Sequence, residues 1–272
     1  MRKIFVFIAV FLVFTANAID LCTQRNTTFK AGEELNYELY YNLSFIWVHA
    51  GNARFSVRQA FHGNKPAYQL QAIGTTIKSF DNFFRVRDTL TTFVDTTYMA
   101  PFSFCQSNHE DNYWKKTEID FRKTGNEWTA DMTAIKRSKI IKETVSSEKC
   151  FFDILSCVYQ FRNIDTSHLQ PNQQIPFQLV LDDGLYPLHL RYVKTEEVKL
   201  HNNERYRCLV FKPMLVEGDV FKNADGMTIW VTDDENKIPV YIESKIRVGS
   251  LKAQVNGMKN LRHKSTAKVT KK

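Results

Sequence analysis

The sequence lacks the motifs that mark the common kinds of catalytic and cofactor sites. It holds no Gly-x-Ser-x-Gly element for a nucleophilic serine and no glycine-rich loop that would cradle a phosphate. Its seven histidines are scattered, with no pair spaced for shared ligation of a metal ion. We therefore expect a protein that is not an enzyme, with no catalytic residue, no metal site and no cofactor.

Long apolar runs are missing after the first residues. A membrane-spanning helix needs about 20 apolar residues, and no later stretch approaches this length. The start of the chain combines a charged end, a short apolar run and small residues, namely Arg2 and Lys3, Ile4 to Phe14, and Ala16 and Ala18. This pattern predicts a secretory signal peptide over residues 1–18. The protein is therefore expected to be exported and to contact a membrane at most peripherally.

The central part of the chain has no excess of one charge, although the formal net charge is +8. Of the 37 basic residues, eight lie in residues 1–18 and 259–272, and the other 29 equal the 29 acidic residues. A nucleic-acid-binding domain should carry its excess charge on a folded face. We therefore expect no nucleic-acid partner. Residues 259–272 are interpreted as a basic disordered tail, with a weak attraction to anionic lipid or polysaccharide.

The five cysteines are an odd number for an exported chain, so they cannot all pair within one molecule. If the segment between Cys150 and Cys157 is helical, the two are separated by roughly 10 Å, beyond the Cα distance of about 7 Å that a disulfide tolerates. Cys208 lies within a strand-like segment and is interpreted as a small buried thiol. By elimination, Cys22 and Cys105 remain as a candidate pair.

What the sequence does contain is alternation with a period of two residues. Three segments between Met227 and Val255 each place apolar residues on one face, as expected for antiparallel strands with a single buried side. Further strand-like segments precede them at spacings of about ten residues. The predicted fold is mainly β, with a strongly curved antiparallel sheet, open barrel or sandwich formed by one domain over residues 19–258.

Two segments break this rhythm with helical spacing. In the first, Asp153 to Arg162, Asp153 can cap a helix whose apolar face is formed by Ile154, Leu155, Val158 and Phe161. We predict one short helix there, packed against the sheet. The second segment contains Ile77, Phe80, Phe83 and Phe84, and predicts one or two helical turns. These turns either plug the core, which we favour, or form a lid that contacts a ligand.

Aromatic residues exceed what one strand face needs. Trp230 and Tyr241 are predicted to point away from the apolar side of their strands. Such side chains pack in a core, line a cavity or form a partner surface. The candidate ligand-binding residues are Trp47, Phe80, Phe83, Phe84, Trp230 and Tyr241. By contrast, Asp233 to Asn236 lack the spacing of a calcium loop and are interpreted as a solvated turn.

Several short motifs resemble bacterial exported proteins of domain-of-unknown-function family 3108. They are Gly32 to Tyr37, Ala50 to Ala53, Asp153 to Ser156 with Tyr159 and Arg162, and Trp230 to Asp234 with Ile238 to Val240. That family has no established activity, so the resemblance implies no catalytic residue. The closing strands, with tryptophan, an acidic turn and Ile-Pro, resemble more weakly the Lol lipoprotein carriers, in which a curved sheet closed by a helix shelters acyl chains.

These observations together predict a non-enzymatic envelope protein of a Gram-negative bacterium, periplasmic or associated with the outer envelope. It is expected to bind an apolar or lipid-like ligand, or an envelope partner. One alternative is a carbohydrate-binding or carbohydrate-active protein, which would use exposed aromatic side chains and a pair of carboxylates. The carboxylates that could form such a pair are Glu38, Asp88, Glu110 and Asp183. Another is an assembly module without a small ligand.

Overall fold

The computed structural model describes residues 19–43, 46–137, 139–181, 184–214, 226–246 and 249–270. The predicted signal peptide and Asp183 lie outside these residues. The described residues form fourteen strands and one α-helix, α1 (Ile154–Phe161), after a single 3-10 turn, η1 (Leu21–Thr23). The strands are β1 (Glu34–Leu43), β2 (Ile46–His62), β3 (Lys65–Thr76), β4 (Arg87–Asp95), β5 (Pro101–Glu110), β6 (Tyr113–Thr124), β7 (Glu127–Lys136), β8 (Lys139–Ser147), β9 (Gln174–Leu181), β10 (Gly184–Lys199), β11 (Arg205–Pro213), β12 (Met227–Thr232), β13 (Pro239–Lys245) and β14 (Ser250–Lys259).

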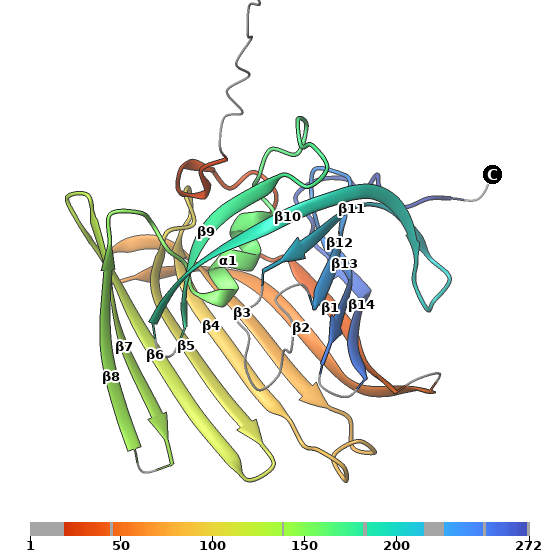
Figure 1. Cartoon of the computed structure of the whole chain (residues 1–272), viewed down its shortest axis with the longest axis horizontal. Coiled ribbons are helices and arrows are strands. Elements are labelled where there is room, and N and C mark those ends of the chain that lie inside the picture. The colour runs from red at the N-terminus through yellow and green to blue at the C-terminus, as the bar shows by residue number, and fades with distance from the viewer. Residues whose placement is uncertain are drawn as a thin grey trace, which may run out of the picture.

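All these strands belong to one antiparallel sheet with the order β8-β7-β6-β5-β4-β3-β2-β1-β14-β13-β12-β11-β10-β9. The first strand therefore pairs with the last in the middle of the sheet, beginning with Glu34 opposite Lys259. Two wings extend from this central seam, β1–β8 on one side and β9–β14 on the other (Figure 1). The prediction of a strongly curved antiparallel sheet is confirmed.

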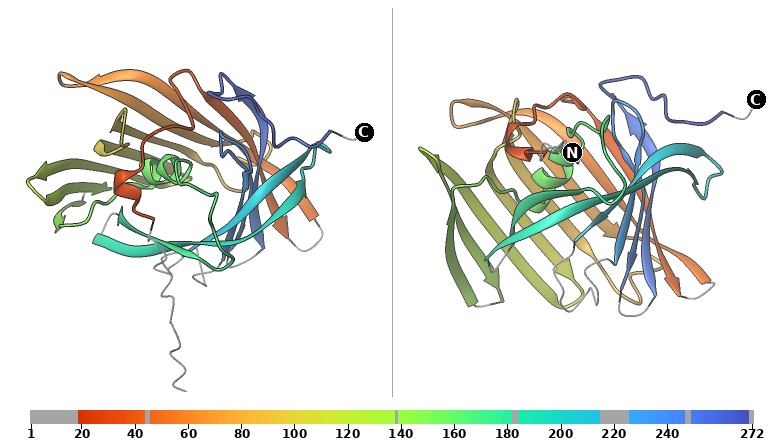
Figure 2. Two further views of the ribbon diagram at one scale, coloured as in Figure 1. Left: turned by 90° about the horizontal axis from the view of Figure 1, so that it is seen from above. Right: turned by 45° about the horizontal axis from the view of Figure 1, so that its top comes forward.

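The two wings curve toward each other and partly enclose α1 (Figure 2). Their outer strands approach at one point, where the Ser147 hydroxyl of β8 donates a hydrogen bond of 3.0 Å to the Gln178 side chain of β9. A parallel bridge between Phe152 and Leu179 lies beside this contact. The described strands do not close into a complete barrel, because β8 and β9 form no ladder with each other.

The predicted helix is confirmed, and its position follows from its cap and its apolar face. The buried Asp153 carboxylate accepts backbone hydrogen bonds from Leu155 and Ser156, which satisfies two amide groups at the helix start. The Thr92 hydroxyl of β4 donates to the same carboxylate at 2.8 Å. This bond ties the helix start to the sheet. The side chains of Leu155 and Tyr159 then enter the main core on the concave face of the first wing.

A buried ion pair fixes the other end of α1. Arg162 donates to both oxygens of Glu33 at 2.6 and 2.9 Å, and the two side chains are 3% and 0% exposed. The guanidinium also donates to the Asn236 carbonyl in the β12–β13 turn and lies over the rings of Phe29 and Tyr159. The segment before β1, the helix end and the second wing therefore meet at one guanidinium.

The prediction of a disordered tail is wrong for the described residues 259–270. Lys259 ends β14, and the chain then returns along the β12–β13 turn, where Asn236 exchanges two hydrogen bonds with the backbone of His263. Farther on, the Ala267 carbonyl accepts from the Arg207 amide at 2.9 Å, and Ala267 is buried. Backbone and side-chain pairing orders this segment, and a basic composition carries no information about such pairing.

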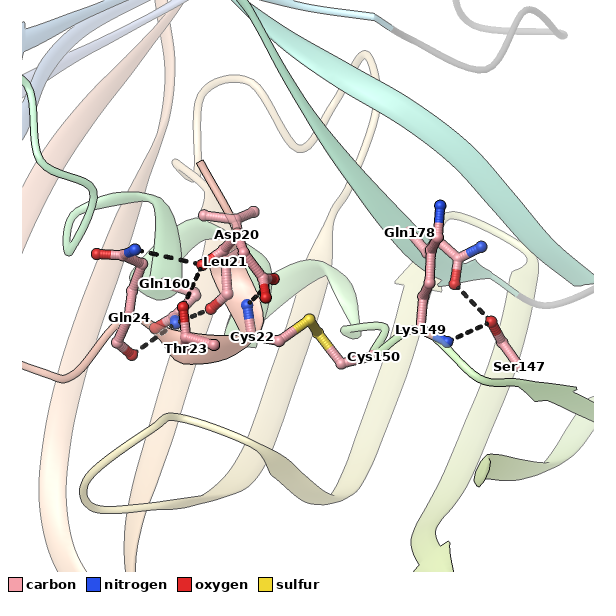
Figure 3. Close-up of a disulfide and its surroundings, with 10 residues drawn as sticks. All are labelled: Asp20, Leu21, Cys22, Thr23, Gln24, Ser147, Lys149, Cys150, Gln160 and Gln178. Carbon is pink, nitrogen blue, oxygen red and sulfur yellow. Dashed lines mark hydrogen bonds between the residues drawn. A yellow bond between two sulfur atoms is a disulfide. The ribbon is translucent and has the colours of Figure 1, made fainter. Parts of the chain in front are cut away.

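The predicted pairing of Cys22 with Cys105 is also wrong, because Cys22 is bonded to Cys150, with a Cα–Cα distance of 5.9 Å. As expected, Cys150 and Cys157 are not bonded to each other. The disulfide joins η1 to the segment before α1. The Gln160 side chain of the helix also donates hydrogen bonds to the carbonyls of Leu21 and Gln24, so η1 is bound to α1 as well (Figure 3). Cys22 meets Cys150 only because η1 folds over the helix, a contact between distant segments that spacing cannot reveal.

Removing one partner of the buried ion pair should destabilise the protein strongly. We expect Arg162→Met to lower the free energy of unfolding by roughly 3–5 kcal/mol, because Glu33 would then be buried without a counter-charge. The double variant Glu33→Met/Arg162→Met should be less destabilised than the two single changes added together. Urea denaturation measures all three. Arg207→Met, which breaks the half-exposed pair with Asp233, is the control and should cost at most about 1 kcal/mol. Additive effects of the two single changes would contradict this interpretation.

The disulfide should contribute a comparable amount of stability. Cys22→Ser/Cys150→Ser is expected to lower the free energy of unfolding by roughly 2–5 kcal/mol, because the bond closes a loop over a separation of 128 residues. Cys105→Ser is the control and should change it by no more than about 0.5 kcal/mol. Peptide mapping without reduction should recover the Cys22 peptide linked to the Cys150 peptide. A Cys22–Cys105 linkage would refute the assignment.

Candidate functional site

An apolar groove lies between α1 and the strands on both sides of the central seam. It consists of two adjoining pockets with free volumes of about 70 and 200 Å³, which share Val158, Arg162 and Pro239. The smaller pocket is also lined by Phe161, Ile164, Thr166, Leu190, Leu209, Phe211, Ile229, Val231 and Lys237. The larger is also lined by Leu35, Tyr37, Leu39, Ala53, Phe55, Tyr159, Ile242 and Ala253. We call these residues together the apolar groove.

The strand register explains why so many apolar side chains gather there. Ile229, Ile242, Ala253 and Leu39 are consecutive partners across β12, β13, β14 and β1. Directly paired residues of antiparallel strands project to the same face, so these four form one apolar row on the concave side. Alanine at 253 leaves space in this row that a larger side chain would fill.

The short helix leaves this row partly open. Eight residues at about 1.5 Å each give α1 a length of roughly 12 Å, too short to cover both wings. Its buried side packs on β3 and β4 of the first wing and on β9 of the second, while Ile154 and Val158, one helical turn apart, remain 42% and 40% exposed. Val158 borders both pockets. The groove is therefore apolar on the helix side as well as on the sheet side.

Apart from two tyrosines, the described residues that line the groove include three with polar or charged side chains. They are Arg162, Thr166 and Lys237. Arg162 is neutralised by Glu33. Lys237 forms no ion pair with a described carboxylate at salt-bridge distance. Burial lowers the pKa of Lys237, although Asp165 and the acidic residues of the neighbouring turn act in the opposite direction. Lys237 is therefore a partly desolvated lysine in the lining of a mostly apolar groove, with carboxylates near enough to act on its charge.

The structure places Trp230 and Tyr241 outside this groove. Their rings lie 4.8 Å apart, and they form a cross-strand pair on the face opposite Ile229 and Ile242, as the alternation predicts. The Trp230 ring nitrogen donates to Glu196 at 2.8 Å. The two rings therefore pack on each other and on the outer side of the second wing.

Trp47 also lies away from the groove, near the connection between β1 and β2. It is 42% exposed, and the Lys252 ammonium lies 3.7 Å from the centre of its ring. Trp47 and Tyr241 both lie on the outer face, on β2 and β13. None of the six predicted ligand-binding residues lines the groove.

The remaining three, Phe80, Phe83 and Phe84, lie in the connection between β3 and β4. Backbone hydrogen bonds from Phe80 to Ile77 and from Phe84 to Phe80 form the predicted helical turns. The favoured interpretation as a core plug is wrong for Phe83 and Phe84, which are 83% and 43% exposed. These turns project beyond the end of the sheet, where few side chains are available to cover them.

Of the carboxylates considered for glycoside hydrolysis, Asp88 and Glu110 come close enough to influence each other. Burial raises the pKa of both groups, and the Asp88 charge adds to the shift at Glu110. Glu38 lies on the outer face and accepts a hydrogen bond from Tyr40. Neither Asp88 nor Glu110 lines the groove, and neither lies beside the Trp230–Tyr241 pair.

Sequence reasoning did not identify the groove, although it identified most of the apolar strand faces that form it. The signal in the sequence was the alternation in β12, β13 and β14. What it could not indicate was that α1 is too short to cover those faces. No described helix is long and apolar enough to cross a membrane.

Comparisons with known proteins give one matching family model and a similar solved structure. The family model described as "Protein of unknown function (DUF3108)" matches residues 36–256. A solved structure of a β-barrel-like protein of domain of unknown function DUF1849 from Brucella abortus is similar, with a TM-score of 0.56 at 12% identity. That similarity covers 85% of this chain and 98% of the other, and at this identity it shows the fold alone. No curated protein matches the chain.

Proposed function

The chain belongs to the family of unknown function DUF3108, and we propose that it is a non-enzymatic envelope protein that binds an apolar, lipid-like ligand in the apolar groove. The observation that carries this proposal is the groove itself, an uncovered apolar surface between α1 and the central strands. Export is expected from the signal sequence predicted over residues 1–18.

The size of the groove suits part of an acyl chain. An apolar cavity of roughly 150 Å³ is sufficient to hold a benzene-sized ligand, and the larger pocket has about 200 Å³ of free volume. Each methylene group transferred from water to such a site gains about 0.8 kcal/mol. A ligand with a hydrocarbon chain would therefore gain several kcal/mol without any specific polar contact.

Lys237 supports a more specific ligand class, an amphiphile with an anionic head group. Lys237 lines the smaller pocket among apolar side chains, and its ammonium forms no ion pair at salt-bridge distance among the described residues. A carboxylate or phosphate on the ligand would supply a direct ion-pair partner, which the more distant carboxylates of Asp165 and of the β12–β13 turn do not. The apolar chain would then extend from the smaller pocket along α1 into the larger one.

The carbohydrate alternative has less support. Sugar rings stack on exposed aromatic faces, whereas Trp230 and Tyr241 pack on each other and Trp230 is bonded to Glu196. The mutually interacting carboxylates, Asp88 and Glu110, belong to β4 and β5 in the other wing. The Trp230–Tyr241 pair and this carboxylate pair therefore do not form one site.

Filling the larger pocket should weaken ligand binding. We expect Ala253→Trp to reduce the affinity for a dansyl-labelled fatty acid at least about tenfold, because the indole would occupy the space of the hydrocarbon chain. Fluorescence titration measures this affinity. Asn256→Trp, at an exposed position of the same strand, is the matched control and should bind as the unmodified protein does. Equal affinities for all three proteins, with unfolding midpoints showing them folded, would refute the groove as the binding site.

Replacing Lys237 should weaken the preference of the protein for an anionic head group, while the apolar chain of the ligand should still bind. The unmodified protein should prefer the labelled fatty acid over its methyl ester, and Lys237→Met should reduce that ratio about fivefold, as expected for one charge-assisted contact. Lys264→Met, at an exposed position of the C-terminal segment, is the control. The preference should disappear as pH rises through the lysine pKa, because the neutral amine no longer attracts the carboxylate. An unchanged ratio in Lys237→Met would exclude this role.

A further inference from the structure

Most of the exposed large apolar side chains lie at one end of the sheet. The antiparallel order places the connections β1–β2, β3–β4, β5–β6, β7–β8 and β13–β14 at the same end, which is the lower edge in Figure 1. Exposed apolar residues there include Ile46, Trp47 and Val48 beside the first connection, Phe83 and Phe84 in the second, and Ile140 beside β7–β8. We call these six residues the apolar rim.

The opposite end of the sheet is different. Among the described residues, its exposed large apolar side chains are Phe61 beside the β2–β3 turn and Tyr98 in the β4–β5 turn. Single exposed apolar residues are normal on soluble proteins, whereas a series of them along one edge indicates an interaction surface. The asymmetry between the two ends therefore identifies the rim as the surface to explain.

The start of β2 is apolar on both of its faces. Ile46 and Val48 point to one side and Trp47, between them, to the other, with exposures of 53%, 41% and 42%. A flat protein partner would cover only one side of such a strand end. The interfacial region of a lipid bilayer can surround it, because acyl chains and head groups adapt to a projecting tip. Tryptophan is also a side chain favoured at that depth.

Charge at the rim favours anionic lipid. The β7–β8 connection has Lys136, Arg137 and Lys139 next to the exposed Ile140, and no acidic residue lies between positions 132 and 142. At the first connection, the Lys252 ammonium lies over the Trp47 ring and is paired with Glu243, so the positive charge available to lipid is that of the β7–β8 connection. Basic residues interleaved with apolar ones are the pattern that binds membranes containing anionic head groups.

We propose that the apolar rim docks this protein on the surface of a bilayer that contains anionic lipid. The six side chains of the rim enter the interfacial region, basic side chains contact the head groups, and the sheet stands on the membrane by this end. This surface is separate from the groove, although β14 connects them. Leu251 of β14 is exposed near the rim, and Ala253, two residues farther along the same strand, lines the larger pocket.

Sedimentation with lipid vesicles tests the proposal. The purified full-length protein should bind vesicles of phosphatidylglycerol and phosphatidylethanolamine and should bind phosphatidylcholine vesicles much less. Trp47→Ser/Phe83→Ser/Phe84→Ser should reduce partitioning at least about tenfold, since three interfacial side chains are lost. Phe61→Ser/Tyr98→Ser, which removes the exposed apolar residues of the opposite end, is the matched control and should bind as the unmodified protein does.

A second variant separates the charge contribution from the apolar one. Lys136→Gln/Arg137→Gln/Lys139→Gln should weaken binding to the anionic vesicles, and the remaining binding should depend less on salt. Unfolding midpoints equal to that of the unmodified protein confirm that each variant is folded. Groove variants such as Ala253→Trp should still bind vesicles, so failure of the ligand proposal and failure of this one are distinguishable.

Two results would overturn the docking surface. One is equal vesicle binding by the rim variant and the opposite-end variant, which would mean that the rim is not the contact. The other is the absence of binding by the unmodified protein to either kind of vesicle, which would assign the rim to a protein partner instead.

Discussion

The buried ion pair between Glu33 and Arg162 is the interaction on which the arrangement of this protein depends. Desolvating two charges is costly, and here the cost is offset by two charge-assisted hydrogen bonds to Glu33 and by two more to the Asn236 carbonyl. The three residues come from the segment before β1, the end of α1 and the β12–β13 turn. Because Arg162 also borders both pockets, the same contact that joins these segments sets the position of the helix over the groove.

The parts of the fold that could be predicted from the sequence are those decided by neighbouring residues. Alternation in β12, β13 and β14 and the apolar face of α1 are local patterns, so both elements and the antiparallel class followed from them. The Cys22–Cys150 bond and the ordered C-terminal segment depend on contacts between distant parts of the chain. Elimination among cysteines and the composition of the tail therefore gave the wrong result in both cases.

The candidate site was less predictable than the fold for a related reason. Counting aromatic residues identifies side chains that need a partner, but it does not show which of them find one in the protein. Trp230 and Tyr241 find each other, whereas Phe83 remains exposed at the rim. The groove is formed by ordinary aliphatic residues such as Ile242 and Ala253, and it exists because an eight-residue helix leaves them uncovered. Whether a helix covers a sheet face depends on how the two are placed in the complete fold, which local sequence patterns do not indicate.

The pairing of β1 with β14 has a consequence for how the chain folds. Each wing is a series of hairpins between consecutive strands, which form early because their contacts are local in sequence. The central seam joins residues 34–42 to residues 250–259, so it cannot form until almost the whole chain is available. During this interval β1 has an unpaired edge in the middle of the future sheet, which is a site for mispairing with another chain. Protection of β1 by another factor during folding would therefore matter more than protection of any other strand in the first wing.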